Sequence, residues 1–415
     1  MRSKVTRTAP LSDPRLTRGV QILQLAYRSD GVTRAEISEL TGLSPTVVVR
    51  LVGKLVERGL LTAGGFVERP SRGRPSELLN IAPEAGYSVG LEFGRAHLLV
   101  TIVDATGTVR HTNLLPEAPE FTATQATVEA LAQVIRSECG AASVPWDLVR
   151  SVGIALHDVV DAEGRWLTQA ALDIEPMPIS ALLGERLDRL VLAEDVSRAF
   201  ALAEHRDGAA KGKDDAIYLF VGSHGVGSGI FVNGELLRST LGVCGEVGHL
   251  VVEPDGVQCV CGNRGCLETV ASHERVVERF LALARAGIAT SLDWEAGVTF
   301  TATCEAARDG DKVASLVLEE LVVHLARALA SVVNISGATH IVIGGQLASA
   351  GQPFLDRLMA ELRLRSLALL GRQMSVAFAS LPAHAGAWGV GVQALEEAIA
   401  QGRFLTVDPA VEAEK

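Results

Sequence analysis

The residues with the clearest metal-binding chemistry gather between positions 248 and 266, in the stretch GHLVVEPDGVQCVCGNRGC. They are His249, Cys259, Cys261 and Cys266. Three thiolates and one imidazole complete a closed tetrahedral shell around Zn²⁺, which is typical of a structural rather than a catalytic zinc site. Gly262 and Gly265 permit the tight turns that bring both ends of CVCGNRGC to one ion. Short Cys spacings after a His favour this interpretation over four unrelated residues.

The chemistry of these thiols depends on the cellular compartment. The N-terminal residues MRSKVTRTAPLSDPRLTRGV lack the apolar core of a signal peptide. The sequence contains no run of about 18 uninterrupted apolar residues, the length that spans a bilayer. We therefore expect a cytoplasmic protein without a membrane partner, whose cysteines stay reduced and form no disulfide framework.

Charge is divided unevenly along the chain. Its 415 residues exceed one hydrophobic core, so we expect two or three domains. Residues 1–82 contain 13 Lys and Arg against 7 Asp and Glu, a net charge of +6, and the total of -11 leaves -17 for the remainder. A basic N-terminal part on an acidic body indicates that only the N-terminal part binds nucleic acid.

The basic N-terminal part is predicted to contain helices. Residues 1–15 are polar and lack periodicity, so we expect a disordered basic arm. Order is expected to begin near Leu16, because the apolar residues of LTRGVQILQLAY recur at helical spacing. Thr33 and Glu36 form the capping-box pattern of a second helix, which should end at Gly42.

A further helix is predicted to begin at Ser44 and Pro45, as its cap and first-turn residue. Its apolar stripe comprises Val48, Leu51, Val52 and Leu55. Its opposite face presents Thr46, Val47, Arg50 and Lys54. Helix, glycine turn and helix is the arrangement that places a second helix in the major groove of double-stranded DNA, so we expect Ser44 and this face to contact an operator.

The segment after Leu60 fits the wing of a winged helix. LLTAGGFVERPSRGRPSELLNI has two apolar ends and a tip rich in Gly, Arg and Pro. Arg72 and Arg74 at that tip would enter the minor groove or neutralise phosphates. We therefore predict a winged helix-turn-helix domain over residues 16–82. The alternative is a small helical packing module with a solvated basic face.

The acidic body, residues 83–415, alternates apolar strands with helices. GYSVGLEFGRAHLLVTIVDATGTV predicts strands joined by glycine turns, and DDAIYLFVGSHGVGSGIFVNGELL predicts a long hairpin. ATHIVIGGQLA predicts a buried strand. Such alternation is typical of an α/β architecture that binds ligands at strand ends.

Two motifs of the body carry a resemblance to a known family. Residues 245–249 are GEVGH, and residues 259–268 are CVCGNRGCLE. Together with the predicted winged helix and the GRP at 73–75, these motifs resemble those of the transcriptional-repressor branch of the ROK family (repressors, open reading frames and sugar kinases). The resemblance implies a two-lobed actin-like ATPase fold, with lobe one at about 86–196 plus the C-terminal helix, and lobe two at about 197–392.

The resemblance also implies a sugar site beside the zinc. In the family, the Glu and His of GExGH and the Glu after the last Cys bind sugar hydroxyls, and a catalytic base lies at the position of Asp195. The expected ligand-binding residues here are Glu194, Asp195, Glu246, His249 and Glu268. Fixed carboxylates accept hydrogen bonds from vicinal hydroxyls. The alternative is that these acids are solvated loop residues.

The chain departs from the kinases of the family where they bind ATP. Its first glycine turn is LEFGRA, in which Glu92 replaces the Asp of the kinases. The hydroxyl residue that binds phosphate in the kinases is absent from this turn, which has Arg95 instead. In the second phosphate loop His224 replaces a Thr, and Glu194 and Ser197 replace two asparagines on the sugar side. We therefore expect no ATP binding and an altered sugar pocket.

These features favour a sugar-responsive transcriptional regulator, a repressor, over two alternatives. Its partners would be an operator DNA, a small-molecule sugar or sugar derivative, and a second copy of the chain in a homodimer or higher homo-oligomer. The first alternative is an ATP-dependent sugar kinase with Asp195 as base. The second is a body that acts only as a dimerisation and protein-docking scaffold.

Overall fold

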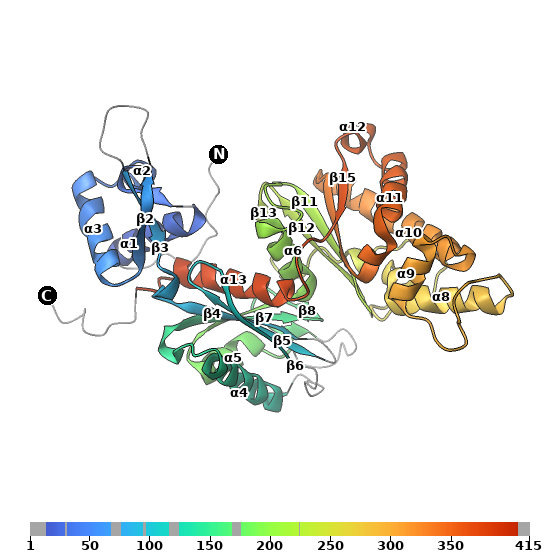
Figure 1. Cartoon of the computed structure of the whole chain (residues 1–415), viewed down its shortest axis with the longest axis horizontal. Coiled ribbons are helices and arrows are strands. Elements are labelled where there is room, and N and C mark those ends of the chain that lie inside the picture. The colour runs from blue at the N-terminus through green and yellow to red at the C-terminus, as the bar shows by residue number, and fades with distance from the viewer. Residues whose placement is uncertain are drawn as a thin grey trace. The chain divides into compact units, whose positions relative to one another are not determined.

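The computed structural model describes residues 14–29, 31–67, 76–93, 97–115, 124–167, 176–223 and 225–405. The chain forms two compact units (Figure 1). Unit 1 comprises Met1–Ala155, Pro178–Ala193 and Ala387–Lys415, and unit 2 comprises Leu156–Met177 and Glu194–Gly386. The lobes expected from the sequence divide at about residue 196, whereas the chain already enters unit 2 once between residues 156 and 177.

The N-terminal part of unit 1 is a winged helix-turn-helix domain, as the sequence predicts. Its elements are α1 (Pro14–Arg28), β1 (Val32–Thr33), α2 (Arg34–Thr41), α3 (Pro45–Glu57), β2 (Leu61–Val67) and β3 (Ser76–Ile81). The capping box is present, because the Glu36 carboxylate accepts a 2.8 Å hydrogen bond from Thr33 N and Thr33 Oγ1 accepts one from Glu36 N. Gly42 ends α2 with a φ of 70°, a conformation that favours glycine.

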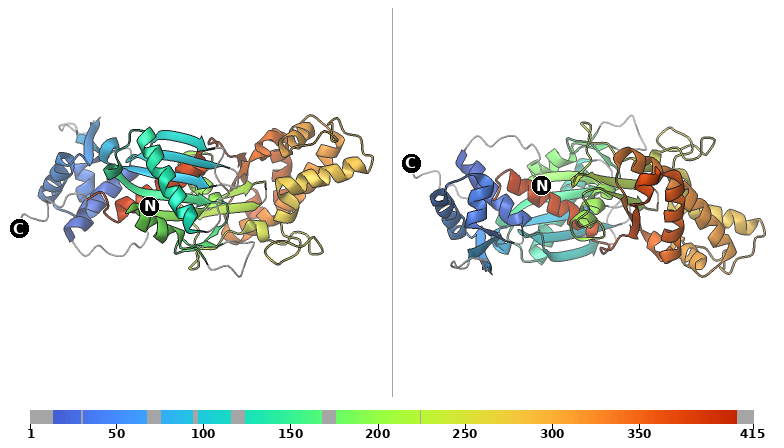
Figure 2. Two further views of the ribbon diagram at one scale, coloured as in Figure 1. Left: turned by 90° about the horizontal axis from the view of Figure 1, so that it is seen from below. Right: turned by 90° about the horizontal axis from the view of Figure 1, so that it is seen from above.

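The sheet of unit 1 has the strand order β10-β7-β4-β5-β6. Its strands are β4 (Tyr87–Phe93), β5 (Leu98–Asp104), β6 (Val109–Leu115), β7 (Val149–Leu156) and β10 (Leu190–Asp195). Helices α4 (Gln125–Ala141) and α5 (Ile179–Leu187) cover one face and α13 (Ala385–Ala400) covers the other (Figure 2). Gly90 of β4 has no side chain because a Cβ there would lie 1.8 Å from the Ala387 carbonyl oxygen of α13.

The sheet of unit 2 has the order β13-β12-β11-β14-β15. Its strands are β11 (Ala216–Val221), β12 (Val226–Val232), β13 (Glu235–Leu236), β14 (His340–Gly345) and β15 (Ser375–Phe378). When the strands of each sheet are numbered from 1 to 5 along the chain, both sheets have the order 3-2-1-4-5. In both, strand 1 pairs antiparallel with strand 2, and strand 2 with strand 3. This repeated topology is that of the two-lobed actin-like fold, which the sequence predicts.

Strand β11 shows how the core of unit 2 is divided. Successive side chains of a strand point to opposite faces. Ile217 and Leu219 belong to the large core cluster on one face, which includes α8 (His273–Arg285), α9 (Phe300–Arg308), α10 (Lys312–Ser336) and α11 (Gly351–Arg365). Tyr218 packs on the other face with Ala201 of α6 (Val196–Asp207). Among the helices of the described ranges, none is long and apolar enough to cross a membrane.

Candidate functional site

The four residues predicted as metal ligands come together in unit 2. The ligand atoms of His249, Cys259, Cys261 and Cys266 all lie within 4.8 Å of one another. His249 Nδ1 is 3.6 Å from Cys259 Sγ, and Cys261 Sγ is 3.6 Å from Cys266 Sγ. Cys259 and Cys266 are buried. Three sulfur atoms and one imidazole nitrogen at such spacing form a donor set that fits a tetrahedral zinc ion.

The backbone of the loop explains why these side chains converge. Gly262 and Gly265 have φ values of 93° and 70°, which favour glycine. A Cβ on Gly265 would lie 1.5 Å from the Glu253 carbonyl oxygen, so any other residue there would force the loop apart. Cys259 N donates a 2.8 Å hydrogen bond to Asn263 O, which closes the turn that contains Cys261.

Three carboxylates gather beside this cluster. Glu268 opens the short helix α7 (Glu268–Ala271), and its Oε2 accepts a 3.4 Å hydrogen bond from Val226 N. Burial raises the pKa of Asp195 to about 6, and the neighbouring negative charge of Glu246 adds to the rise. Burial likewise raises the pKa of Glu246, and Glu268 adds to it. Glu246 therefore lies near enough to both Asp195 and Glu268 for their negative charges to repel, and the three carboxylates offer acceptors suited to the hydroxyls of a polyol.

Asp195 also begins a helix. Its Oδ1 accepts hydrogen bonds from Ser197 N at 2.8 Å and Arg198 N at 3.2 Å, so it is the N-cap of α6. A carboxylate at this position stabilises the first turn of the helix. The capping role leaves the second carboxylate oxygen as the atom that would meet a ligand.

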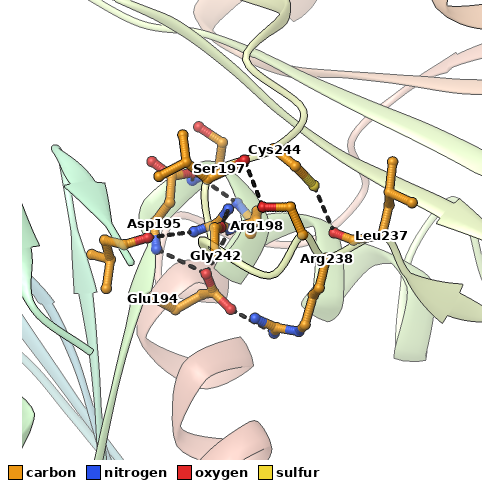
Figure 3. A network of polar contacts seen from close by, with 11 residues as sticks. Glu194, Asp195, Ser197, Arg198, Leu237, Arg238, Gly242 and Cys244 are labelled. Atoms are coloured by element: carbon orange, nitrogen blue, oxygen red, sulfur yellow. Dashed lines mark hydrogen bonds and ion pairs between the residues drawn. The ribbon is translucent and has the colours of Figure 1, made fainter. Parts of the chain in front are cut away.

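Glu194, which the sequence places among the ligand-binding residues, is bonded to protein through both oxygens (Figure 3). Its Oε1 accepts a 2.6 Å hydrogen bond from Arg198 Nε, and its Oε2 accepts one of 2.6 Å from Arg238 Nη2. Burial alone would raise the pKa of Glu194, but the two guanidinium groups outweigh it, and the pKa lies below its usual range. Glu194 is thus an ionised, buried member of an ion-pair network.

Arg198 is the centre of this network, and sequence reasoning missed it. Its side chain is buried, and besides Glu194 it donates to the carbonyl oxygen of Gly242 at 2.7 Å (Figure 3). It also donates to the carbonyl oxygen of Val160 at 3.2 Å. It therefore ties the loop at Gly242 and the short strand β8 (Val159–Val160) to the start of α6. The Glu-x-x-x-Arg spacing of Glu194 and Arg198 was the available signal.

The glycines of the expected second phosphate loop have a packing role. A Cβ on Gly227 would lie 2.0 Å from Ser197 Oγ, and one on Gly229 would lie 2.3 Å from the Ala201 Cβ. Both glycines therefore let β12 approach α6 closely. Of the other phosphate-loop positions, Glu92 is buried in β4, whereas residues 94–96 and His224 lie outside the described residues.

The predicted DNA-binding residues of α3 lie where the sequence pattern places them. Ser44, Thr46, Arg50 and Lys54 are exposed and Val47 is partly buried. Val48, Val52 and Leu55 are buried on the opposite side, and Leu51 is partly buried. Within the described ranges the Ser44 side chain makes no capping hydrogen bond, although Ser44 is the N-cap residue. Arg72 and Arg74 lie outside the described residues.

A winged helix-turn-helix domain, a type of domain that binds DNA, is followed here by two sheets of identical strand order, which define an actin-like fold. Residues 88–397 match the ROK family, and residues 20–73 match the MarR family. The chain belongs to the ROK family, as its motifs indicate.

Named relatives are similar over most of the chain. The DNA-binding transcriptional dual regulator NagC of Escherichia coli (strain K12) and the N-acetylglucosamine repressor of Shigella flexneri are each 29% identical over 341 residues, 81% of this chain and 82% of theirs.

Two solved structures show the same fold. One is a ROK family transcriptional regulator described as a homolog of the E. coli MLC protein, with a TM-score of 0.81 and 24% identity over 95% of this chain and 98% of that one. The other is a ROK family glucokinase from Streptomyces griseus in complex with glucose and AMPPNP, with a TM-score of 0.61 and 28% identity over 74% and 99%.

Proposed function

We propose that this protein is a sugar-responsive transcriptional repressor that binds operator DNA through α3 and the wing. The proposal rests on the presence of two features in one chain. Helix α3 exposes Thr46, Arg50 and Lys54, and in the body Asp195 and Glu246 lie close together. The NagC protein and the N-acetylglucosamine repressor, as relatives, support it.

The body senses the ligand and holds two chains together. A sugar or sugar derivative binds at Asp195, Glu246, His249 and Glu268, and the protein acts in the cytoplasm as a homodimer or higher homo-oligomer. Ligand binding shifts the population of body conformations, which changes the spacing of two DNA-binding domains and hence the fit to two half-sites.

The metal is a structural zinc ion held by His249, Cys259, Cys261 and Cys266. The donor set fits zinc, and a closed shell supplies no open position for chemistry. The ion would fix the loop that leads into Glu268 and would orient the imidazole of His249.

The DNA-binding proposal is tested on α3. Arg50→Ala should weaken binding to a duplex selected by the wild-type protein from a random library by about 10-fold or more, because a lost base contact costs about 1–3 kcal/mol. Arg28→Ala is the matched control, since Arg28 is also exposed in this domain but lies at the end of α1. Gel-shift titration at fixed salt measures both. Equal affinity of the two variants, or full binding by residues 83–415 alone, would contradict the proposal.

A second candidate function is sugar phosphorylation. Asp195, with its pKa raised to about 6, has the proton affinity of a general base, and this one observation favours a kinase. The packing of Gly227 and Gly229 argues against a kinase. Their closeness to α6 accounts for the glycines in β12, so these glycines are no evidence for a phosphate-binding loop.

We expect no ATP-dependent phosphorylation of any sugar, because phosphoryl transfer requires a site that positions the nucleotide phosphates and magnesium. A coupled ADP-release assay over hexoses, amino sugars and pentoses measures it. Asp195→Asn should alter the sugar-induced rise in melting temperature rather than a turnover rate, because a bound ligand stabilises the folded state. Magnesium-dependent turnover that Asp195→Asn abolishes would make the protein a kinase.

A further inference from the structure

Gly53 occupies the middle of α3 without a structural reason. Its φ is not in the left-handed region, and a Cβ built at Gly53 would have no atom of the described residues within 4 Å other than its two chain neighbours and the backbone of α3. Glycine in a helix interior is destabilising relative to alanine. An alanine would therefore fit the free protein and would stabilise α3.

Two other helical glycines, Gly19 and Gly391, differ from Gly53. A Cβ on Gly19 of α1 would lie 2.9 Å from Leu405 Cδ1, and one on Gly391 of α13 would lie 3.1 Å from Gly90 Cα. These glycines allow close packing between elements. The missing side chain of Gly53 serves no such contact in the described part of the protein.

The surroundings of Gly53 on the helix surface indicate its partner. Residues three and four apart are neighbours on a helix, so Val49 and Arg50 precede Gly53 on the same face, and Val56 follows it. Val49 is 57% exposed and Val56 is 41% exposed. Gly53 therefore leaves a depression on the helix surface between the exposed Val49 and Val56, next to Arg50.

We propose that Gly53 is the point of closest approach of α3 to DNA, and that Val49 makes an apolar contact with a thymine methyl group next to it. The inference rests on the proposed DNA binding. Thymine is the base that presents a methyl group in the major groove, where an apolar side chain discriminates it. The basic charge of the domain favours DNA over a protein partner as the occupant of this face.

The test separates helix stability from DNA contact. Gly53→Ala should melt at a temperature equal to or above that of the wild type, yet bind the duplex selected by the wild-type protein about 10-fold more weakly. Gly140→Ala is the matched control, because Gly140 lies in α4 and a Cβ there also meets no atom of the described residues within 4 Å. It should leave DNA affinity unchanged.

The apolar contact has its own readout. Val49→Ala, carried through the same selection from a random library, should lose the preference for thymine at one position of the site while keeping the other positions. Unchanged DNA affinity of Gly53→Ala would overturn the close approach, and an unchanged thymine preference of Val49→Ala would overturn the methyl contact. A change in oligomeric state of Gly53→Ala with unchanged DNA affinity would assign this face to a protein contact instead. Failure of the wild-type protein to select any duplex would overturn both the proposed function and this inference.

Discussion

Cys261→Ser should lose the bound zinc ion and unfold unit 2 at a temperature lower by roughly 10 °C or more. The reason is that a structural zinc site forms only in the folded state, so its binding free energy is part of the folding free energy. Cys261 is only partly buried, so the substitution itself leaves no cavity that would explain such a loss. Metal content per chain and thermal unfolding, each with and without a chelator, measure the effect.

Cys244→Ser is the control for the loss of a thiol as such. Cys244 is also partly buried in unit 2, and it lies outside the cluster, where its Sγ donates to Leu237 O at 3.1 Å. This variant should keep one zinc ion per chain and nearly the wild-type melting temperature. Wild-type protein that contains no metal, or a Cys261→Ser variant that melts like Cys244→Ser, would refute the zinc assignment.

The parts of the structure that the sequence predicts well are those set by local spacing. Cys259, Cys261 and Cys266 lie within eight residues, and Gly265 fixes the turn between them, so convergence follows from a short segment. The capping box of Thr33 and Glu36 is local in the same way, since one helical turn contains both partners.

Glu194 shows where such reasoning ends. The family pattern places it beside a ligand, but its carboxylate bonds Arg198, four residues away, and Arg238, which is 44 residues away in the sequence. Only the folded chain brings Arg238 to this position, and no spacing rule predicts a partner at that separation. The glycines of β12 are similar, because the closeness of α6 decides that Gly227 serves packing.

The Arg198 network carries the second prediction with a large expected effect. Arg198→Met should lower the free energy of unfolding by about 3–5 kcal/mol, because it removes the buried guanidinium that pairs with the buried Glu194 carboxylate, while Arg238, which is about half exposed, remains as its cation. Arg186→Met is the matched control. Arg186 also pairs with a glutamate, Glu129, through two hydrogen bonds of 2.7 Å, but both side chains are exposed, so the loss of stability should be small.

At acid pH, the free energies of unfolding of the wild type and Arg198→Met should differ less than at pH 7. The depressed pKa of Glu194 contributes stability above the usual glutamate range, and that contribution is lost as the pH falls through the folded-state pKa. In the variant, Glu194 takes up a proton more readily, which relieves the buried charge. Urea unfolding of both proteins at pH 7 and at about pH 4 measures the gap.

Glu194→Met combined with Arg198→Met decides how much of the effect comes from the charge. Replacing both partners of a buried ion pair by apolar residues is often close to neutral, so the double variant should regain most of the lost stability. The recovery should stay incomplete, because the carbonyl oxygens of Gly242 and Val160 still lose their donor. A double variant as unstable as Arg198→Met would show that Arg198 acts through these two carbonyls, by holding their backbone segments at the start of α6, and not through its pairing with Glu194.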